Sequence, residues 1–99
     1  MSKESTERRR ANRRPVRLPV EVGPDRGWTR DISPSGVYFE TARAPAPGTP
    51  IRFTVFWKAP SPRPLRLECQ GRIIRTERRA GMMGVAVAII ASRWLEGPE

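Results

Sequence analysis

Prolines and glycines divide this sequence into short segments, and that division restricts the fold more than any other feature. The chain contains 11 prolines and 8 glycines in 99 residues, and between them apolar residues recur at every second position. Proline interrupts helices and central strands, and a period of two places apolar side chains on one face of a strand. The sequence therefore predicts short strands joined by turns, without an amphipathic helix.

Six segments show this alternation. They are residues 16–22, 28–32, 37–41, 51–57, 65–74 and 84–90. In the third, Val37 and Phe39 are expected to point inward, and Tyr38 outward. The alternation slips at Ile73–Ile74, close to Gly71, which predicts a bulge or sharp bend of the kind that barrel corners need.

These segments predict an all-β fold, a small six-stranded antiparallel β-barrel, because closure into a barrel removes exposed sheet edges. We expect a flexible basic arm over residues 1–14, one barrel domain over residues 15–92 and a tail over residues 93–99. The carboxyl-terminal part of the chain allows at most one short helical turn, over Ala91 to Leu95. The hydrophobic content of 37% is sufficient for one domain of this size.

The cysteine and histidine content argues against metal and enzyme chemistry. Cys69 is the single cysteine and lies in an apolar strand pattern, so we expect a buried structural thiol in a reducing compartment. The sequence has no histidine, the commonest general base and a common metal ligand. We expect no cofactor, no metal and no catalysis. Without an export signal or a membrane-spanning stretch, a cytoplasmic location is expected, with no membrane insertion.

Positive charge is concentrated at the amino terminus. Residues 1–17 hold seven basic and two acidic side chains, a net of +5 out of +9 for the whole chain. Of the 19 basic residues only Lys3 and Lys58 are lysine, and the arginine fork suits phosphates and guanine edges. With almost no apolar residue before Val16, the arm should stay mobile until an anion orders it. Alone, this segment is more simply interpreted as a disordered basic tail.

A second motif, Asp31-Ile32-Ser33-Pro34-Ser35-Gly36, lies between two of the expected strands. A carboxylate can accept hydrogen bonds from guanine N1 and N2, and a serine hydroxyl can reach a phosphate. Gly36 would permit a positive φ or the close approach of a ligand. In isolation the motif is an ordinary turn capped by its own side chains.

Taken together, the motifs Arg9-Arg10-Ala11-Asn12-Arg13 and Asp31 to Gly36 resemble those of the PilZ family. The resemblance continues through Pro47-Gly48-Thr49, Gly71 to Ile73 and Gly84 to Val87, and covers roughly residues 7 to 90. It implies a receptor for cyclic di-GMP.

By this resemblance, Arg9 and Arg13 grip the phosphates and guanines, while Asp31, Ser33 and Gly36 hold a guanine base. Arg10 and Arg14 have the same spacing as the arginine pair; we prefer Arg9 and Arg13 for their position relative to Pro15-Val16. Arg8 could contact a second, intercalated molecule of cyclic di-GMP, which gives up to two ligands per protomer.

The resulting hypothesis is a receptor and adaptor that changes conformation on binding cyclic di-GMP and regulates an unidentified effector protein in trans. By resemblance, the outputs are motility, exopolysaccharide or biofilm control. The alternative is a basic β-barrel that binds RNA or single-stranded DNA, for which only Tyr38 and Phe56 offer outward stacking surfaces. A third possibility is a family member that acts purely as an interaction module.

The three tryptophans are a further group of aromatic residues that could contact a ligand. Tryptophans on strand faces usually belong to the core, and this is the expectation for Trp28 and Trp57. Trp94 lies beyond the barrel pattern, so a lid or partner contact is weighed there against the favoured structural role.

Overall fold

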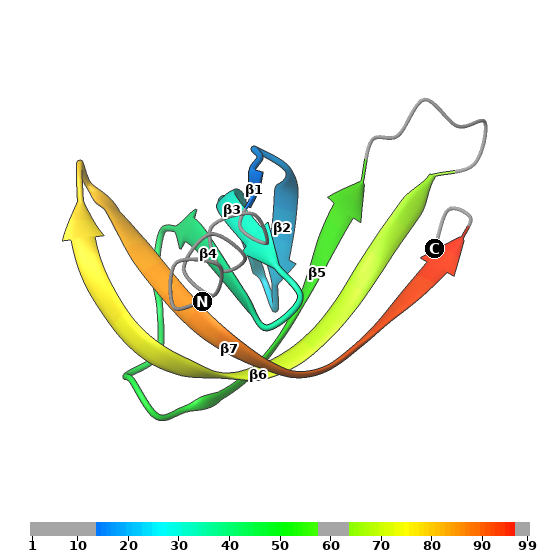
Figure 1. Cartoon of the computed structure of the whole chain (residues 1–99). Coiled ribbons are helices and arrows are strands. Elements are labelled where there is room, and N and C mark those ends of the chain that lie inside the picture. Colours follow the sequence, from blue (N-terminus) through cyan, green and yellow to red (C-terminus); the bar gives the residue numbers. More distant parts are fainter. Residues whose placement is uncertain (1–13, 58–63, 97–99) are drawn as a thin grey trace, which may run out of the picture.

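The computed structural model describes residues 14–57 and 64–96, and these form antiparallel strands joined by turns. The strands are β1 (Arg14–Pro15), β2 (Pro19–Val22), β3 (Asp25–Ser33), β4 (Gly36–Thr41), β5 (Pro50–Trp57), β6 (Leu65–Arg79) and β7 (Met82–Glu96). Six of them close in the order β3-β2-β5-β6-β7-β4, with β4 pairing back onto β3 (Figure 1). The predicted six-stranded antiparallel barrel is therefore confirmed. Within the described part there is no helix that could cross a membrane.

The first strand of the barrel is broken, whereas the sequence predicted one continuous strand from Val16 to Val22. β1 and β2 lie along the same edge of β3, and the residues between them have no register partner, although the Val16 N–H still donates to the Arg30 carbonyl at 3.1 Å and the Thr29 N–H to the Leu18 carbonyl at 2.8 Å. The buried hydroxyl of Thr29 bridges the break, because it accepts a hydrogen bond from the Leu18 N–H at 2.9 Å and donates one to the Val16 carbonyl. A side chain thus replaces the missing backbone partner.

The barrel interior is filled by the apolar side chains that the alternation placed on one face. They are Leu18, Val20, Val37, Phe39, Ile51, Phe53, Val55, Cys69, Ile73, Val85 and Val87. The Phe39 and Phe53 rings, from β4 and β5, meet with centroids 5.2 Å apart. The inward direction predicted for Val37 and Phe39 and the burial predicted for Cys69 are confirmed.

Two bulges bend the long β6–β7 hairpin around the barrel. The register between these strands shifts at Gln70/Gly71 and again at Ile73/Arg75. This confirms the bend predicted from the slipped alternation. Gly71 is required there, because a Cβ at this position would lie 2.3 Å from the Ala88 carbonyl oxygen.

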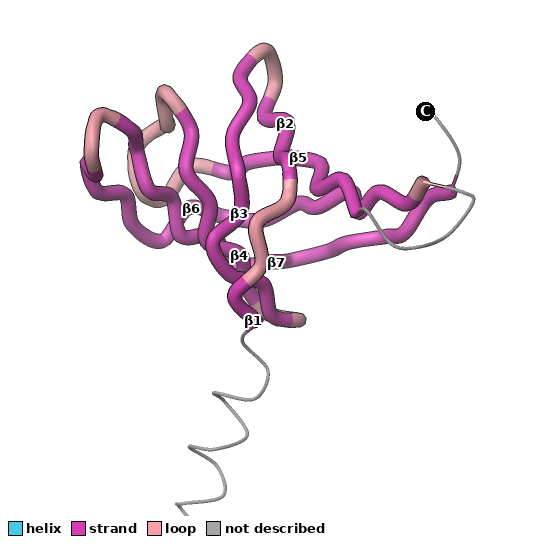
Figure 2. The backbone as a smooth tube through the Cα atoms, turned by 90° about the horizontal axis from the view of Figure 1, so that it is seen from above, coloured by secondary structure: helices cyan, strands magenta, loops and turns pink. Residues whose placement is uncertain are grey.

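Beyond the barrel, β5, β6 and β7 continue as a three-stranded flap. We define the flap as residues 56–57, 65–68 and 90–96. Pairing of β4 with β7 ends at Ala88 and pairing of β2 with β5 ends at Val55, so the flap projects past the closed part (Figures 1 and 2). Residues 91–95 are therefore strand and not the helical turn that the sequence allowed.

The tryptophans are less buried than the sequence suggested. Trp28 lies on the outer face of β3, is 40% exposed and packs its ring against the guanidinium of Arg17, 4.6 Å away. The core expectation was wrong for Trp28, because the inward position is taken by its neighbour Thr29. Trp57 packs partly against the core and meets the half-exposed Trp94 edge to face, with centroids 5.5 Å apart.

Candidate ligand-binding site

The turn between β3 and β4 carries the second sequence motif. The Ser33 hydroxyl accepts a hydrogen bond from the Gly36 N–H at 3.1 Å and can donate to the Gly36 carbonyl at 3.3 Å. This is the self-capped turn that the motif predicts in isolation. The hydroxyl is nonetheless adaptable, because its proton can rotate toward a ligand while its oxygen keeps the bond from Gly36.

Gly36 does not have a positive φ, so one of the two reasons expected for this glycine is wrong. Positive φ among the described glycines occurs at Gly23, Gly48 and Gly81. The other reason, close approach, has a structural counterpart within the chain: a Cβ on Gly36 would lie 3.1 Å from the Val87 carbonyl oxygen. There is therefore little room for a side chain at position 36, and without one the backbone is accessible to a ligand.

Asp31 lies where the arm joins the barrel. It pairs with Pro15 of β1 on one side and with Tyr38 of β4 on the other, and it is half-buried on the outer face. No described side chain forms an ion pair or hydrogen bond with its carboxylate. The backbone of Arg14 pairs with Ile32, the next residue along β3. The chain that leads into the arm is thus held beside this carboxylate.

The arginines predicted to bind ligand precede this junction. Arg8, Arg9 and Arg13, and the alternative Arg10, lie outside the described residues, as does the side chain of Arg14. The described part brings together Asp31, Ser33 and Gly36 on the outer face of β3 and β4.

Two rows of outward residues extend this face across β7 to β6. The strand register places one partner from each strand side by side, and both rows end in an arginine. The rows are Ser33–Gly36–Ala88–Arg72 and Asp31–Tyr38–Ala86–Arg75. Three strand spacings separate the ends of a row, about 14 Å along the sheet. The middle of the first row holds only Gly36 and Ala88, which leaves a low strip between the β3–β4 turn and Arg72, and the Tyr38 ring of the second row borders this strip.

Arg72 and Arg75 were not predicted from the sequence as members of this face. Their outward direction follows from the alternation, but the bulge between Ile73 and Arg75 hides which β7 residue each one faces. Arg72 is held by a 2.7 Å hydrogen bond to the Gly48 carbonyl, and the Arg75 guanidinium lies 5.9 Å from the centroid of the Tyr38 ring. Both cations are exposed.

Tyr38 is fixed in place at the edge of the strip. Its hydroxyl donates to the Glu77 carboxylate at 2.7 Å, and Arg79 donates to the same carboxylate at 3.2 Å. Partial burial and the bond to Glu77 raise the pKa of Tyr38, while the bonds from Tyr38 and Arg79 lower the pKa of Glu77. The ring lies over Gly84, where a Cβ would be 2.0 Å from the hydroxyl oxygen.

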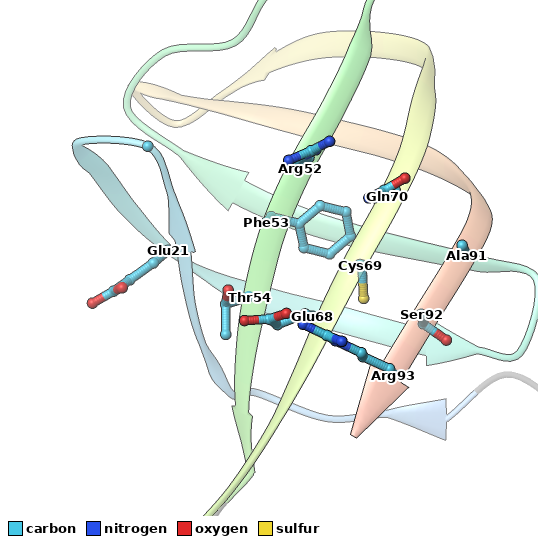
Figure 3. A pocket seen from close by; sticks show the side chains of 11 residues that line it. Glu21, Arg52, Phe53, Thr54, Glu68, Cys69, Gln70, Ala91, Ser92 and Arg93 are labelled. Atoms are coloured by element: carbon cyan, nitrogen blue, oxygen red, sulfur yellow. Dashed lines mark hydrogen bonds and ion pairs between the residues drawn. The ribbon is translucent and has the colours of Figure 1, made fainter. Parts of the chain in front are cut away.

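A groove of about 620 Å³ lies elsewhere, across β2, β5, β6 and β7 (Figure 3). Its charged lining residues are Glu21, Arg52, Glu68 and Arg93, and none of the predicted ligand-binding residues lines it. Figure 3 shows Arg93 beside Glu68, to which it donates at 3.3 Å. The groove and the strip are therefore separate features.

A model of the PilZ domain family matches residues 7–92, nearly the whole chain. The protein therefore belongs to the PilZ domain family, a family of non-catalytic receptors that bind cyclic di-GMP. The match begins within the arginine-rich arm and ends within β7, so it includes both motifs and all six barrel strands. No curated protein and no solved structure matches the sequence.

Proposed function

We propose that this protein is a cyclic di-GMP receptor whose ligand lies on the strip between the β3–β4 turn and β6, under the folded-back arm. The observation that carries the proposal is the placement of Asp31, Ser33 and Gly36 on one outer face, beside the point where the arm leaves. Asp31 accepts from the guanine N1 and N2 hydrogens, and Arg9 and Arg13 bind phosphate and the guanine edge.

Arg72 and Arg75 extend the proposed site on the side away from the arm. Arg72 faces the turn across Ala88 and Gly36, which are too small to obstruct a flat base, and Arg75 lies beside the Tyr38 ring. With arm arginines on one side and strand arginines on the other, both phosphates of the ligand can be paired with guanidinium groups.

Calorimetry with cyclic di-GMP tests this site directly. Asp31→Ala removes charged hydrogen bonds to guanine, so its affinity should fall by about 10- to 100-fold; Arg9→Ala and Arg13→Ala should each weaken binding as well. Arg52→Ala and Asp25→Ala are matched controls, because both residues lie on the barrel surface away from the strip and should leave the affinity unchanged. Equal loss in the Asp25 and Asp31 variants would contradict the proposed location.

The same titrations decide ligand stoichiometry and arginine register. Arg8 is proposed to contact a second, intercalated ligand, so the wild-type protein should bind two molecules and Arg8→Ala should bind one. A stoichiometry of one that Arg8→Ala leaves unchanged would refute this role. If Arg10→Ala and not Arg9→Ala removes binding, the arginine pair is Arg10 and Arg14.

We further propose that ligand binding orders the arm and so changes the surface offered to an effector protein in the cytoplasm of a bacterium. A conformational output requires a difference between free and bound states, and arm ordering supplies it. The proposed outputs are motility, exopolysaccharide or biofilm control. Amide hydrogen exchange over residues 7–14 should slow on addition of cyclic di-GMP; unchanged exchange at saturation would contradict the mechanism.

The alternative of RNA or single-stranded DNA binding receives less support. A stacking platform needs outward aromatics on adjacent strands, but Tyr38 is on β4 and Phe56 on β5, and β6 and β7 separate these strands in the barrel order. Excess RNA should therefore fail to displace cyclic di-GMP, and Asp31→Ala should weaken binding of the dinucleotide far more than binding of RNA.

A further inference from the structure

The flap leaves one edge of β7 open. From Ala91 to Glu96 the strand pairs with β6 on one side, Ile90 is the extra residue of the bulge before this segment, and no described strand pairs with the other side of residues 90–96. The last contact toward β4 is the bond from the Ile89 N–H to the Ser35 carbonyl, at 2.9 Å. The open segment contains neither proline nor lysine, which commonly protect an edge, and its one cation, Arg93, is paired with Glu68 of β6. It can therefore accept another strand.

This edge is also apolar. Four large hydrophobic residues are exposed in the described part of the chain, and two of them, Ile90 at 68% and Trp94 at 53%, are on the open segment. The Trp94 ring rests against Trp57, and its register partner on β6 is Leu67. The flap thus presents apolar surface together with unpaired backbone groups, a combination suited to strand addition.

The distribution of charge on the protein indicates what kind of partner can bind at this edge. The chain as a whole has a net charge of +9, yet the flap holds two cations, Arg66 and Arg93, against two anions, Glu68 and Glu96. Two copies of so basic a protein repel one another over most of their surfaces, and a neutral patch is where they can approach. A polyanion, by contrast, gains nothing at a neutral patch.

We propose that the flap is a homodimerisation site. Two copies pair antiparallel through residues 90–96 about a two-fold axis, which joins two three-stranded flaps into one six-stranded sheet. A segment that pairs antiparallel with itself forms a self-complementary interface, the arrangement that a two-fold dimer requires. The flap projects beyond the barrel (Figures 1 and 2), so the two barrels lie at opposite ends of the joined sheet.

The dimer should be reversible. One short edge buries less than the roughly 800 Å² per partner of a stable interface, so we expect a dissociation constant of about 10 to 100 µM. The strip that carries Asp31 and Ser33 is outside the flap, so dimerisation leaves the proposed ligand site accessible. The proposal is independent of cyclic di-GMP binding.

Sedimentation velocity of the full chain over a concentration series from about 5 to 300 µM tests the proposal. The wild-type protein should shift from monomer to dimer across this range, and Ile90→Glu should remain monomeric because it places two charges at the interface. Ile74→Glu is the matched control: Ile74 is 63% exposed, on β6 outside the flap, and its variant should dimerise like wild type. Circular dichroism verifies that both variants are folded.

Amide hydrogen exchange separates strand pairing from a merely apolar contact. Exchange in residues 90–96 should slow as wild-type concentration rises and should be independent of concentration in Ile90→Glu. A wild-type protein that stays monomeric at the highest concentration overturns the proposal. Equal behaviour of Ile74→Glu and Ile90→Glu, or a dimer without slower exchange in the flap, overturns it as well.

Discussion

The barrel and the flap share the strands β5, β6 and β7 and differ in what covers these strands. In the closed part, β2, β3 and β4 complete the ring, and Val55 of β5 and Val87 of β7 are buried to 1% exposure or less. Where β2 and β4 end, the strands continue, but Trp94 is half-exposed and β7 has an open edge. The alternation of apolar side chains therefore determines which face of a strand is apolar. That face becomes part of a core only where neighbouring strands cover it.

Truncating one aromatic side chain in each region should give the largest contrast. Phe39→Ala removes a fully buried ring that packs on Phe53, and should lower the free energy of unfolding by about 3 to 5 kcal/mol. Trp94→Ala removes a half-exposed ring and should cost about 1 kcal/mol or less in the monomer. Urea unfolding at low protein concentration measures both; similar losses would mean that the flap is as tightly packed as the barrel.

The two regions can also be compared by the reactivity of thiols at two residues that pair across β6 and β7, Cys69 in the barrel and Ser92 in the flap. Burial raises the pKa of the Cys69 thiol to about 11, so at pH 8 its thiolate population should be about 100-fold below that of an ordinary cysteine. Cys69 should react with a disulfide reagent only after unfolding, whereas a thiol introduced by Ser92→Cys, at an exposed site, should react at once. Fast reaction of native wild-type protein would contradict the described burial.

Thr29→Val tests how the barrel tolerates the break between β1 and β2. The substitution keeps the side-chain shape and leaves the Leu18 N–H and the Val16 carbonyl without their partner. We expect a loss of about 1 to 3 kcal/mol in the free energy of unfolding. Ser92→Ala, at an exposed flap position, is the control and should be nearly neutral. A neutral Thr29→Val would show that water or a shifted backbone takes over both bonds.

The smallest effect is expected from acidification. Bonds from Tyr38 and Arg79 lower the pKa of Glu77, so its contribution to stability is present above the ordinary value of 4.5 and is lost as pH falls through the lower pKa of the folded state. Between about pH 5 and 3, wild type should lose slightly more stability than Glu77→Gln. Thermal unfolding across this range measures the difference, and parallel curves would exclude the contribution.

The strands and the bend could be predicted from the sequence because both depend on local patterns. A period of two assigned Val37 and Phe39 to the interior, and the slipped alternation near Gly71 located the bulge. The predictions were wrong where the conformation of a residue depends on its neighbours in the fold. Trp28 is outward because Thr29 occupies the inward position, and residues 91–95 continue as strand because β6 runs alongside them. The Arg72 and Arg75 rows could not be found, since each depends on registers across β4, β7 and β6.

Spacing and residue type are properties of the chain, and they were sufficient to specify the class of fold, the inward direction of Val37 and Phe39 and the two motifs that point to a guanine dinucleotide. The tertiary structure was needed to establish which strands become neighbours, and thereby that Asp31 and Ser33 share an outer face with two arginines from β6. It also showed that β7 extends beyond the end of its pairing with β4, which leaves one edge of β7 open. Both depend on strand pairing between residues far apart in the chain, where register and relative strand length, not local pattern, decide what is covered.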